Sequence, residues 1–248
     1  LLENKKNMET NLLRKNQIAE NIYTHVHHEG KKSEKPEIEA SLGAKGFQIY
    51  LKRAFDIVVS SLLILVLSPI LIITALIIKF TSRGKVLYSN ERVGLYGNHF
   101  RCYKFRSMVT NQSIKKEDYQ TALAGQEKGI LHKVKDDARI TWIGKIIRKT
   151  SIDELPQLFN VFLGDMSIIG PRPLVPFMLT PYPEFKDIRC LVRPGITGLW
   201  QIRDRKNNTS AEFMIEPDTE YIKDYSFFLD MKILVKTPLV VITGEGAY

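Results

Sequence analysis

The sequence predicts an α+β protein, mostly helical, that is bound to a membrane and carries one small β-hairpin. Three observations support this prediction. An uncharged apolar run extends from Ile57 to Ile78, two segments with strand-like patterning follow it, and apolar residues recur at helical spacing in several other segments. We expect a polar, flexible tail over residues 1–45, a membrane segment over 46–80 and a domain outside the membrane over 81–248.

Composition narrows the class of partner. Lys and Arg outnumber Asp and Glu by 36 to 27, and the net charge of +9 fits nucleic acid, anionic lipid or a phosphorylated substrate. No helix-turn-helix, zinc-finger or RNA-binding pattern occurs in the sequence, so nucleic acid is not expected. Cys102 and Cys190 lie far apart and form no CxxC pair, which argues against a disulfide framework and against a structural zinc site.

The apolar run permits two interpretations. Its 22 residues would rise about 33 Å as a straight helix, which is enough to cross a hydrocarbon core of roughly 30 Å. Pro69 removes a backbone N–H near the centre, so we expect a kink at Ser68-Pro69, where the serine hydroxyl can satisfy a freed backbone group. Basic residues flank both ends, with Arg53 before and Lys79 after. A bent helix that enters and leaves on one side accounts for both flanks, and a spanning helix stays open.

The next segments read as a hairpin. Residues 85–89 and 99–107 alternate like strands and are joined through the glycine-containing segment 94–98. A period of two places Lys104 and Arg106 on the same strand face. Two cations on one face can bind phosphate, and a solvated strand face is the alternative.

Two further segments read as amphipathic helices. Residues 142–148 would bring Arg148 close to the acidic pair that follows in the sequence. Residues 225–242 are apolar with interspersed lysines, so this segment fits a helix in the membrane interface or ordinary core packing.

Asp153 and Glu154 are adjacent carboxylates at a predicted helix start. The segment from Ser151 to Glu154 matches a capping box, but with Ser151 as the cap, Pro156 would fall where its missing N–H costs a hydrogen bond. A helix that begins at Asp153 places Pro156 in the first turn, where it is tolerated. We therefore expect a helix from Asp153 to near Gly164. Its inward residues would be Leu155, Leu158, Phe159 and Phe162.

This register has chemical consequences. A helix N-terminus favours ionised carboxylates and attracts phosphate, and an ionised Asp153 can attack phosphorus to form a covalent intermediate. Arg148 and Arg172, the latter on a rigid Gly-Pro-Arg-Pro turn, can supply the positive charge that two approaching anions need. Mg²⁺ is the natural bridge between phosphates and the carboxylates of Asp153 and Glu154.

Five stretches, in this order, resemble the monotopic phosphoglycosyl transferases, a group of bacterial sugar transferases. They are Lys52–Asp56, Tyr103–Met108, Ser151–Asn160, Gly164–Pro173 and Val192–Gln201. The resemblance covers the chain from about residue 50 to the C-terminus and is to the compact form of the family. It implies transfer of a sugar 1-phosphate from a UDP-sugar to polyprenyl (undecaprenyl) phosphate with release of UMP, as the first membrane step of a surface glycan.

The resemblance also implies roles for single residues. Asp153 would be the nucleophile that carries the phospho-sugar, and Glu154 would organise Mg²⁺ or assist the acceptor phosphate. The phosphate-binding and further site residues implied are Lys104, Arg148, Arg172, Arg193, Arg205 and Asp230. The chain departs from many relatives at Arg203-Asp204-Arg205, where they have a Gly-Arg turn.

The same resemblance implies a location. The membrane run would be a re-entrant helix-break-helix at Ser68-Pro69, with the catalytic domain on the cytoplasmic face of the bacterial inner membrane. Two alternatives remain open at this point: a single-step, metal-dependent transfer in which Asp153 only holds the metal, and an inactive membrane-tethered scaffold for glycan assembly. A homo-oligomeric state is also left open.

Overall fold

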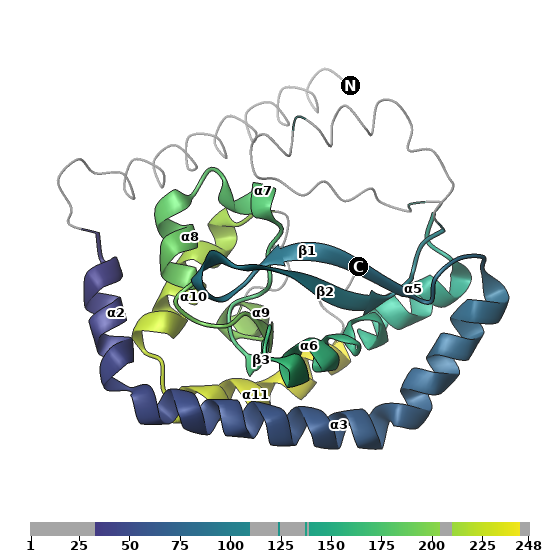
Figure 1. Cartoon of the computed structure of the whole chain (residues 1–248). Helices are drawn as coiled ribbons and strands as arrows, with labels where there is room; N and C mark the ends of the chain where they lie inside the picture. The colour runs from purple at the N-terminus through teal and green to yellow at the C-terminus, as the bar shows by residue number, and fades with distance from the viewer. Residues whose placement is uncertain (1–32, 110–123, 125–136, 138, 204–209, 244–248) are drawn as a thin grey trace. The chain divides into compact units, whose positions relative to one another are not determined.

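The computed structural model describes residues 33–109, 124, 137, 139–203 and 210–243. Residues 1–34 and residues 35–248 form separate units, and the second is described here (Figure 1). Its helices are α2 (Lys35–Ala44), α3 (Gly46–Thr81), α5 (Trp142–Lys149), α6 (Gln157–Leu163), α7 (Pro176–Leu179), α8 (Pro183–Arg189), α9 (Leu199–Arg203), α10 (Glu212–Lys223) and α11 (Phe227–Thr243). Its strands are β1 (Leu87–Val93), β2 (His99–Phe105), β3 (Ser167–Ile169) and β4 (Gly195–Thr197), and two 3₁₀ turns are η1 (Leu95–Gly97) and η2 (Ile152–Glu154). The predicted, mostly helical α+β class is confirmed for the described residues.

The predicted hairpin is confirmed, with its strands shifted by a few residues. Strands β1 and β2 pair antiparallel from Leu87 opposite Phe105 to Val93 opposite His99. A second sheet was not predicted: β3 and β4 pair parallel, with Ser167 opposite Gly195. Each of these strands has only three residues, too few for a pattern of alternation to be seen in the sequence.

Helix α2 lies in the segment that was expected to be a flexible tail. Ile38 and Leu42, four residues apart on one helix face, are both buried in the main hydrophobic core. Burial of these two side chains explains why residues 35–44 are ordered as a helix, because helices of this length depend on tertiary packing. The first 32 residues of the predicted tail lie outside the described residues.

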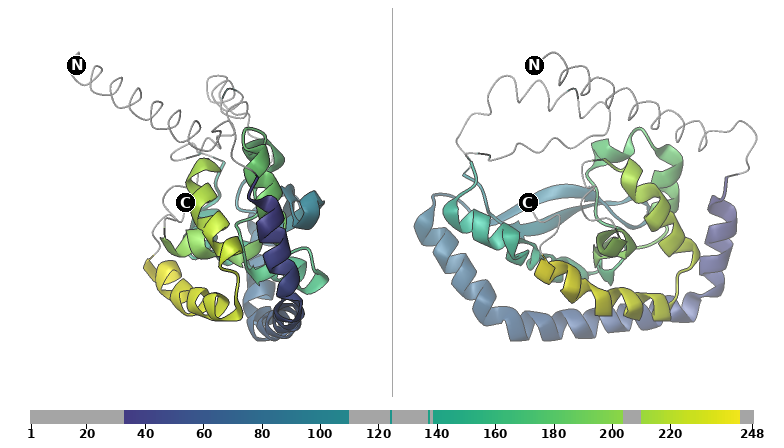
Figure 2. Two further views of the ribbon diagram at one scale, coloured as in Figure 1. Left: turned by 90° about the vertical axis from the view of Figure 1, so that its left-hand side faces the viewer. Right: turned by 180° about the vertical axis from the view of Figure 1, so that it is seen from behind.

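Helix α3 turns its polar residues towards the protein. Lys52, Asp56 and Ser60, spaced four residues apart, are buried. Lys52 donates to Asp230 of α11 at 2.7 Å between Nζ and Oδ2. The Asp56 carboxylate accepts from the backbone N–H of Ile168 in β3 at 2.9 Å. Figures 1 and 2 show α11 running beside the first part of α3. These bonds fix α3 to the elements that carry the rest of the core.

Arg53 attaches the same helix to α6. Its guanidinium donates to the carbonyl oxygens of Val161 at 2.7 Å and Phe162 at 2.8 Å. Carbonyls in the last turn of a helix have no partner within the helix, and a cation there also complements the helix dipole. Arg53 therefore stabilises the end of α6 and the contact between the two helices together.

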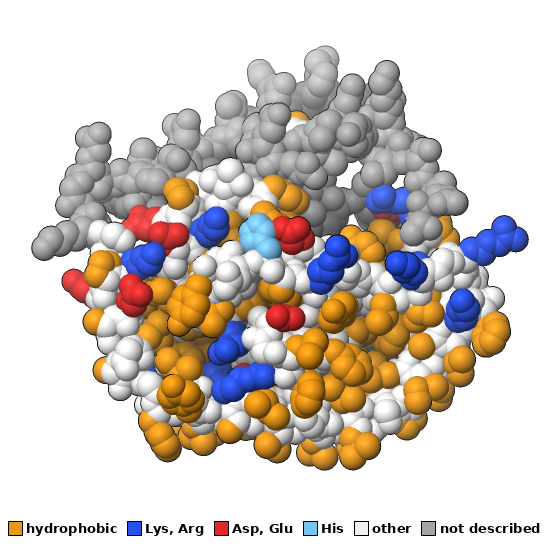
Figure 3. Space-filling view, viewed as in Figure 1, with side chains coloured by type: hydrophobic (Ala, Val, Ile, Leu, Met, Phe, Trp, Pro, Cys, Tyr) orange, Lys and Arg blue, Asp and Glu red, His pale blue; other side chains and the backbone are white. Residues whose placement is uncertain are grey.

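The opposite face of α3 is apolar and exposed. Only 11% of its most apolar window of 18 residues is buried, and it is the one described helix that is long and apolar enough to cross a membrane by length and composition. Figure 3 shows hydrophobic side chains gathered along the lower part of the view, where α3 runs in Figure 1. Large exposed residues of α3 include Val58, Leu62, Leu65, Val66, Ile72, Ile73, Leu76 and Phe80. Apolar residues of α3 also pack inwards, among them Phe55, Val59 and Leu63, so the helix is apolar on both sides, as is typical of a helix that water does not surround.

Pro69 lies inside α3 without ending it. Its missing N–H would have bonded the carbonyl of Leu65, four residues earlier. The hydroxyl of Ser68 donates to that carbonyl instead, at 2.7 Å. The axis of α3 changes direction part-way along its length (Figure 1). The predicted role of Ser68 in satisfying a freed backbone group is confirmed.

Arg106 is neither on a solvated strand face nor at a phosphate-binding site, so both predictions for it were wrong. It is buried, and its guanidinium donates to the carbonyls of Arg83 at 2.9 Å and Ser82 at 2.8 Å, just beyond the end of α3. A third bond reaches the carbonyl of Ile78. Arg106 therefore caps the C-terminal end of the long helix. Its role is structural and differs from that of Lys104, which bonds Glu154.

The parallel pair β3–β4 requires glycine. A Cβ atom on Gly195 would overlap with the backbone nitrogen of Gly170, and one on Gly198 would overlap with the carbonyl oxygen of Gly170. Both clashes are with backbone, which cannot move aside as a flexible side chain can. The short sheet therefore depends on close approach of two chain segments.

We expect Gly195→Ala to destabilise the protein by about 3 kcal/mol, the upper end of the range for overpacking, because the new methyl group meets backbone. Gly43→Ala is the matched control: Gly43 lies in α2 with nothing within 4 Å of its added Cβ, and alanine should stabilise a helix there by about 0.5–1 kcal/mol. Thermal unfolding of both variants in the same detergent measures the difference. Equal melting temperatures would show that the segments can separate.

Candidate active site

The acidic pair lies in the 3₁₀ turn η2, between α5 and α6. The chain enters the turn through Ser151 in a left-handed conformation, with φ +57°, and its side chain does not cap the turn. Pro156 is the N-cap residue of α6, which ends at Gly164 with φ +99°. The prediction that a regular helix begins at Asp153 was wrong, because α6 begins one turn later. Its predicted end at Gly164 is confirmed.

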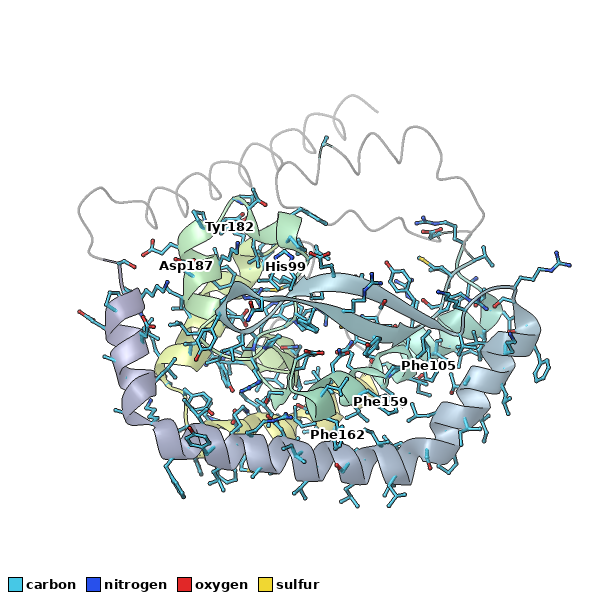
Figure 4. All side chains as sticks on the ribbon, in the orientation of Figure 1. His99, Phe105, Phe159, Phe162, Tyr182 and Asp187 are labelled. Atoms are coloured by element: carbon cyan, nitrogen blue, oxygen red, sulfur yellow. The ribbon has the colours of Figure 1, made fainter. Side chains whose placement is uncertain are left out.

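Helix α6 presents its aromatic residues outwards. Leu158 is buried as predicted, but Phe159 and Phe162 are 42% and 48% exposed, so the prediction that they point inwards was wrong. Figure 4 shows both rings on the side of α6 nearest to α3 in that view. They extend the exposed apolar face of α3, which explains why hydrophobic periodicity alone misplaced them.

Glu154 is held by two cations. The Nζ atom of Lys104, on β2, lies 2.6 Å from Glu154 Oε1, and a guanidinium nitrogen of Arg172 lies 3.5 Å from the same oxygen. The three side chains are between 19% and 27% exposed, so solvent screens this cluster only in part. Two residues proposed from the sequence as phosphate ligands are thus brought to one carboxylate.

The environment of Asp153 differs from that of Glu154. Burial, and then the negative charge of Glu154, raises the pKa of Asp153 to about 6, against the charges of Lys104, Arg148 and Arg172, which lower it. No described residue donates a hydrogen bond to its carboxylate. The expectation that a helix N-terminus would favour the ionised form is not met, since burial dominates. A partly buried carboxylate that is still ionised at neutral pH and is held by no donor is suited to act as a nucleophile.

A small polar crevice lies beside Glu154. Arg92, Lys104, Gln157 and Arg172 contribute to its lining, so three cations surround one carboxylate. Sequence reasoning missed Arg92. The predicted first strand ended at residue 89, short of Arg92. In the structure Arg92 pairs with Phe100, which lies on the same strand face as Lys104. The positive charge in excess of Glu154 makes the crevice suited to phosphate.

An apolar cavity of about 270 Å³ meets the same two side chains from the other direction. Glu154 and Arg172 line both the cavity and the crevice. The apolar lining comes from three regions, α3, the chain around α6 and β3, and α9 with α11. Representative residues are Leu63, Leu67, Leu155, Leu158, Ile202 and Leu234. Glu154, the chain neighbour of Asp153, thus lies where an apolar cavity meets a group of cations.

The donor set fits Mg²⁺ only in a limited way. Among the described residues no group of three or more His, Cys, Asp or Glu side chains could hold a metal ion. Asp153 and Glu154 are adjacent, however, and Mg²⁺ commonly takes one or two carboxylates and completes its shell with substrate phosphates and water. Asp153 and Glu154 fit a site of this kind, in which substrate phosphates and water complete the coordination shell.

The remaining residues proposed from the sequence lie elsewhere. Arg148, on the last turn of α5, is close enough to lower the pKa of Asp153. The Nε atom of Arg193 donates to the carbonyl of Gly164 at 2.9 Å, just after the end of α6. Asp230 is buried in the ion pair with Lys52. Arg205 lies outside the described residues.

The comparisons with known proteins agree with the motifs. The family model described as bacterial sugar transferase matches residues 47–244. The chain is 45% identical over 210 residues to the undecaprenyl-phosphate galactose phosphotransferase of Salmonella typhimurium, covering 83% of this chain and 43% of that protein. It is 38% identical to exopolysaccharide production protein ExoY of Sinorhizobium fredii, covering 79% of this chain and 88% of that protein.

A third relative is the UDP-glucose:undecaprenyl-phosphate glucose-1-phosphate transferase of Klebsiella pneumoniae, 38% identical over 82% of this chain and 42% of that protein. The chain therefore spans less than half the length of several relatives, among them the Salmonella and Klebsiella proteins. Since the family model covers the membrane helix, the acidic pair and the arginine turn together, the chain belongs to the bacterial sugar transferase family.

Proposed function

We propose that the protein transfers a sugar 1-phosphate from a UDP-sugar to a polyprenyl phosphate, releases UMP, and so starts the synthesis of a surface polysaccharide or glycoconjugate. The names of two relatives, which act on undecaprenyl phosphate with galactose or glucose, support this proposal. One observation carries it. Asp153 has a pKa of about 6 and accepts no hydrogen bond from a described residue, and its chain neighbour Glu154 lines both a positively charged crevice and an apolar cavity.

The crevice suits the donor. A UDP-sugar carries two phosphate groups. The crevice has a volume of only about 10 Å³, so these groups would bind at its mouth, where Arg92, Lys104 and Arg172 can reach their oxygens through charge-assisted hydrogen bonds. Lys104 already neutralises Glu154, so that carboxylate repels the diphosphate less than a free one would. The charge of the crevice is therefore complementary to the diphosphate rather than to a neutral sugar.

The cavity suits the acceptor. A polyprenyl phosphate joins an anionic head to a branched hydrocarbon chain, and the cavity joins Arg172 at one end to leucine and isoleucine side chains along its length. Because the hydrocarbon chain would come from the bilayer, the cavity offers it surroundings as apolar as those it leaves, and Arg172 supplies the attraction for its phosphate. Its phosphate would then lie next to the acidic pair.

The chemistry follows in two steps. An oxygen of ionised Asp153 attacks the β-phosphorus of the UDP-sugar, the bond to the bridging oxygen breaks, and UMP leaves with that oxygen. Asp153 then carries the sugar phosphate as an acyl phosphate. A phosphate oxygen of the acceptor attacks the same phosphorus, and the carboxylate of Asp153 leaves. The product is a polyprenyl diphosphate sugar, and no net proton transfer is required.

Charge stabilisation accompanies both steps. Arg172 and Lys104 are placed to balance the negative charge that gathers at phosphorus. Mg²⁺ held by Asp153 and Glu154 would neutralise the diphosphate of the donor. Glu154, fixed by its two cations, keeps its charge next to Asp153 and so raises the pKa of the nucleophile.

The membrane placement is part of the same proposal. Helix α3 is re-entrant: it dips into the cytoplasmic leaflet of the bacterial inner membrane and returns at Pro69. Lys52 near its start and Ile78 near its end both bond to the same folded unit, which supports this arrangement, because a spanning helix would put its ends on opposite sides. Ser68 leaves no unsatisfied carbonyl at Leu65 in the hydrocarbon. The exposed Phe228, Val235 and Leu239 of α11 fit the membrane interface.

We expect Asp153→Asn to lower UMP release by about 10³-fold or more, because the amide is no nucleophile. Incubation of the wild-type protein with sugar-labelled UDP-galactose, without acceptor, should leave label on the protein after denaturation. Asp187→Asn, an exposed aspartate on α8 (Figure 4), is the matched control and should retain the label. Unchanged turnover in Asp153→Asn would refute the assignment of Asp153 as the nucleophile. A wild-type protein that releases UMP only when the acceptor is present would favour a single-step transfer.

UMP release without acceptor should fall about tenfold per pH unit below pH 6, because a protonated Asp153 cannot attack. Omitting the acceptor removes the titration of its own phosphate, whose second pKa is also about 6. Arg148→Met removes a charge that favours the ionised form, so the acid limb should move to higher pH. A pH–rate profile that is flat between pH 5 and 7, or a limb that this variant leaves in place, would contradict the assignment.

Both ends of α3 should be accessible from the cytoplasm. Cys102 and Cys190 are buried, so single cysteines introduced at Ser41 and Lys85, which are both exposed, can be probed with a maleimide that does not cross membranes. Both cysteines should react only in samples in which the reagent has access to the cytoplasmic side of the membrane. Val66→Cys, 62% exposed in the protein, should stay unreactive because lipid covers it. Labelling of the two ends from opposite faces would restore a spanning helix.

A further inference from the structure

Arg172 is held in an unusually fixed turn. The two flanking prolines, Pro171 and Pro173, have no N–H and restrict the backbone. Four consecutive carbonyls, from residue 171 to residue 174, each accept a hydrogen bond. The donors, in order, are Gly195 N, the Arg189 guanidinium, the Arg92 guanidinium and Val93 N. Four hydrogen bonds therefore fix the backbone that carries Arg172.

Arg189 is the donor to the carbonyl of Arg172 itself. The same nitrogen, Nη2, lies 3.3 Å from Oδ2 of Asp218 on α10. The two side chains are only 4% and 1% exposed, and the guanidinium lies over the ring of Phe185, 5.2 Å from its centroid. The pair thus joins α8 and α10 directly beneath the arginine turn.

Burying this pair is costly. Desolvation of two charges commonly exceeds their mutual attraction, and apolar replacements of similar size are often as stable or more so. Packing α8 against α10 therefore does not require charges. What the charges provide here is a strong, directed donor to one carbonyl, that of Arg172.

The guanidinium of Arg172 has close neighbours on two sides. It lies 3.5 Å from Glu154 Oε1 and 5.7 Å from the centroid of the buried Trp200 ring. A small rotation of the backbone at residue 172 would be amplified along the long side chain and would move the guanidinium away from the carboxylate. The geometry of the crevice therefore depends on the conformation of the turn.

We propose that Arg189 and Asp218 form a positioning unit for Arg172: the buried pair holds the carbonyl of Arg172 and thereby directs its guanidinium towards the phosphates of the donor. This inference rests on the proposed function. Arg189 does not itself touch the substrate, because its side chain is enclosed beneath the turn and is only 4% exposed.

A double-mutant cycle in the full-length protein tests the proposal. Arg189→Met should lower kcat/KM for UDP-galactose by about 10–100-fold, the range for groups that orient a ligand indirectly. Arg172→Met should lower it at least as much. If Arg189 acts through Arg172, the double variant should lose no more than Arg172→Met alone. Arg189→Lys, which can still donate to the carbonyl, should recover part of the activity.

Glu220→Gln is the matched control. Glu220 lies on α10 two residues after Asp218, and its ion pair with Arg203 is exposed, so kcat/KM should be unchanged. If Arg189→Met does not fold, Asp218→Asn, which keeps the shape of the side chain, replaces it in the same cycle. Losses that multiply in the double variant, or a variant as active as Glu220→Gln, would overturn the proposal.

The same double-mutant cycle can be measured without turnover, by determining the affinity of each variant for UDP by calorimetry. A wild-type protein that binds UDP but releases no UMP would refute the proposed function, and the cycle in UDP affinity would still test the positioning unit. A wild-type protein that turns over normally, with additive losses in the cycle, would refute only the positioning unit.

Discussion

The exposed apolar face of α3, with its few polar side chains buried on the other side, is the constraint on which the rest of the structure depends. A helix that exposes its apolar face must direct its few polar groups inwards, and buried polar groups need partners there. Lys52 finds Asp230, Asp56 finds the backbone of β3, and Arg53 finds the last carbonyls of α6. The bonds that the helix needs therefore also fix α11, β3 and α6. The contacts that satisfy the polar groups of the helix are therefore also contacts that assemble the core.

This assembly gives two adjacent acids different environments. Glu154 faces the cations of β2 and the arginine turn, whereas Asp153 is partly buried and accepts no hydrogen bond from the part of the chain that the structure describes. A regular helix would have offered backbone N–H groups to both. The 3₁₀ turn offers none to Asp153, so burial and the charge of Glu154 raise its pKa, while the nearby cations limit the shift. The turn geometry, more than the identity of the two residues, separates their properties.

The sequence was sufficient where the signals are local. The hairpin, the apolar helix, the role of Ser68 and the end of α6 at Gly164 could all be predicted from spacing and backbone chemistry. Arg106 and Phe159 could not. Arg106 bonds carbonyls more than twenty residues away, which no strand pattern reveals. Phe159 sits on a face that periodicity marks as inward, and this inference fails where the surroundings are themselves apolar. The ordering of α2 likewise depends on distant core contacts.

The cavity that ends at Glu154 has one wall made by α3, the same helix whose other face is exposed and apolar. With the proposed function, a hydrocarbon-chain acceptor reaches this wall by moving sideways within the leaflet, never through water. The rate of the second chemical step then follows the mole fraction of acceptor among the lipids, not its amount per volume of cell. Dilution of the membrane with other lipids would slow the protein, while dilution of the cytoplasm would affect only the donor.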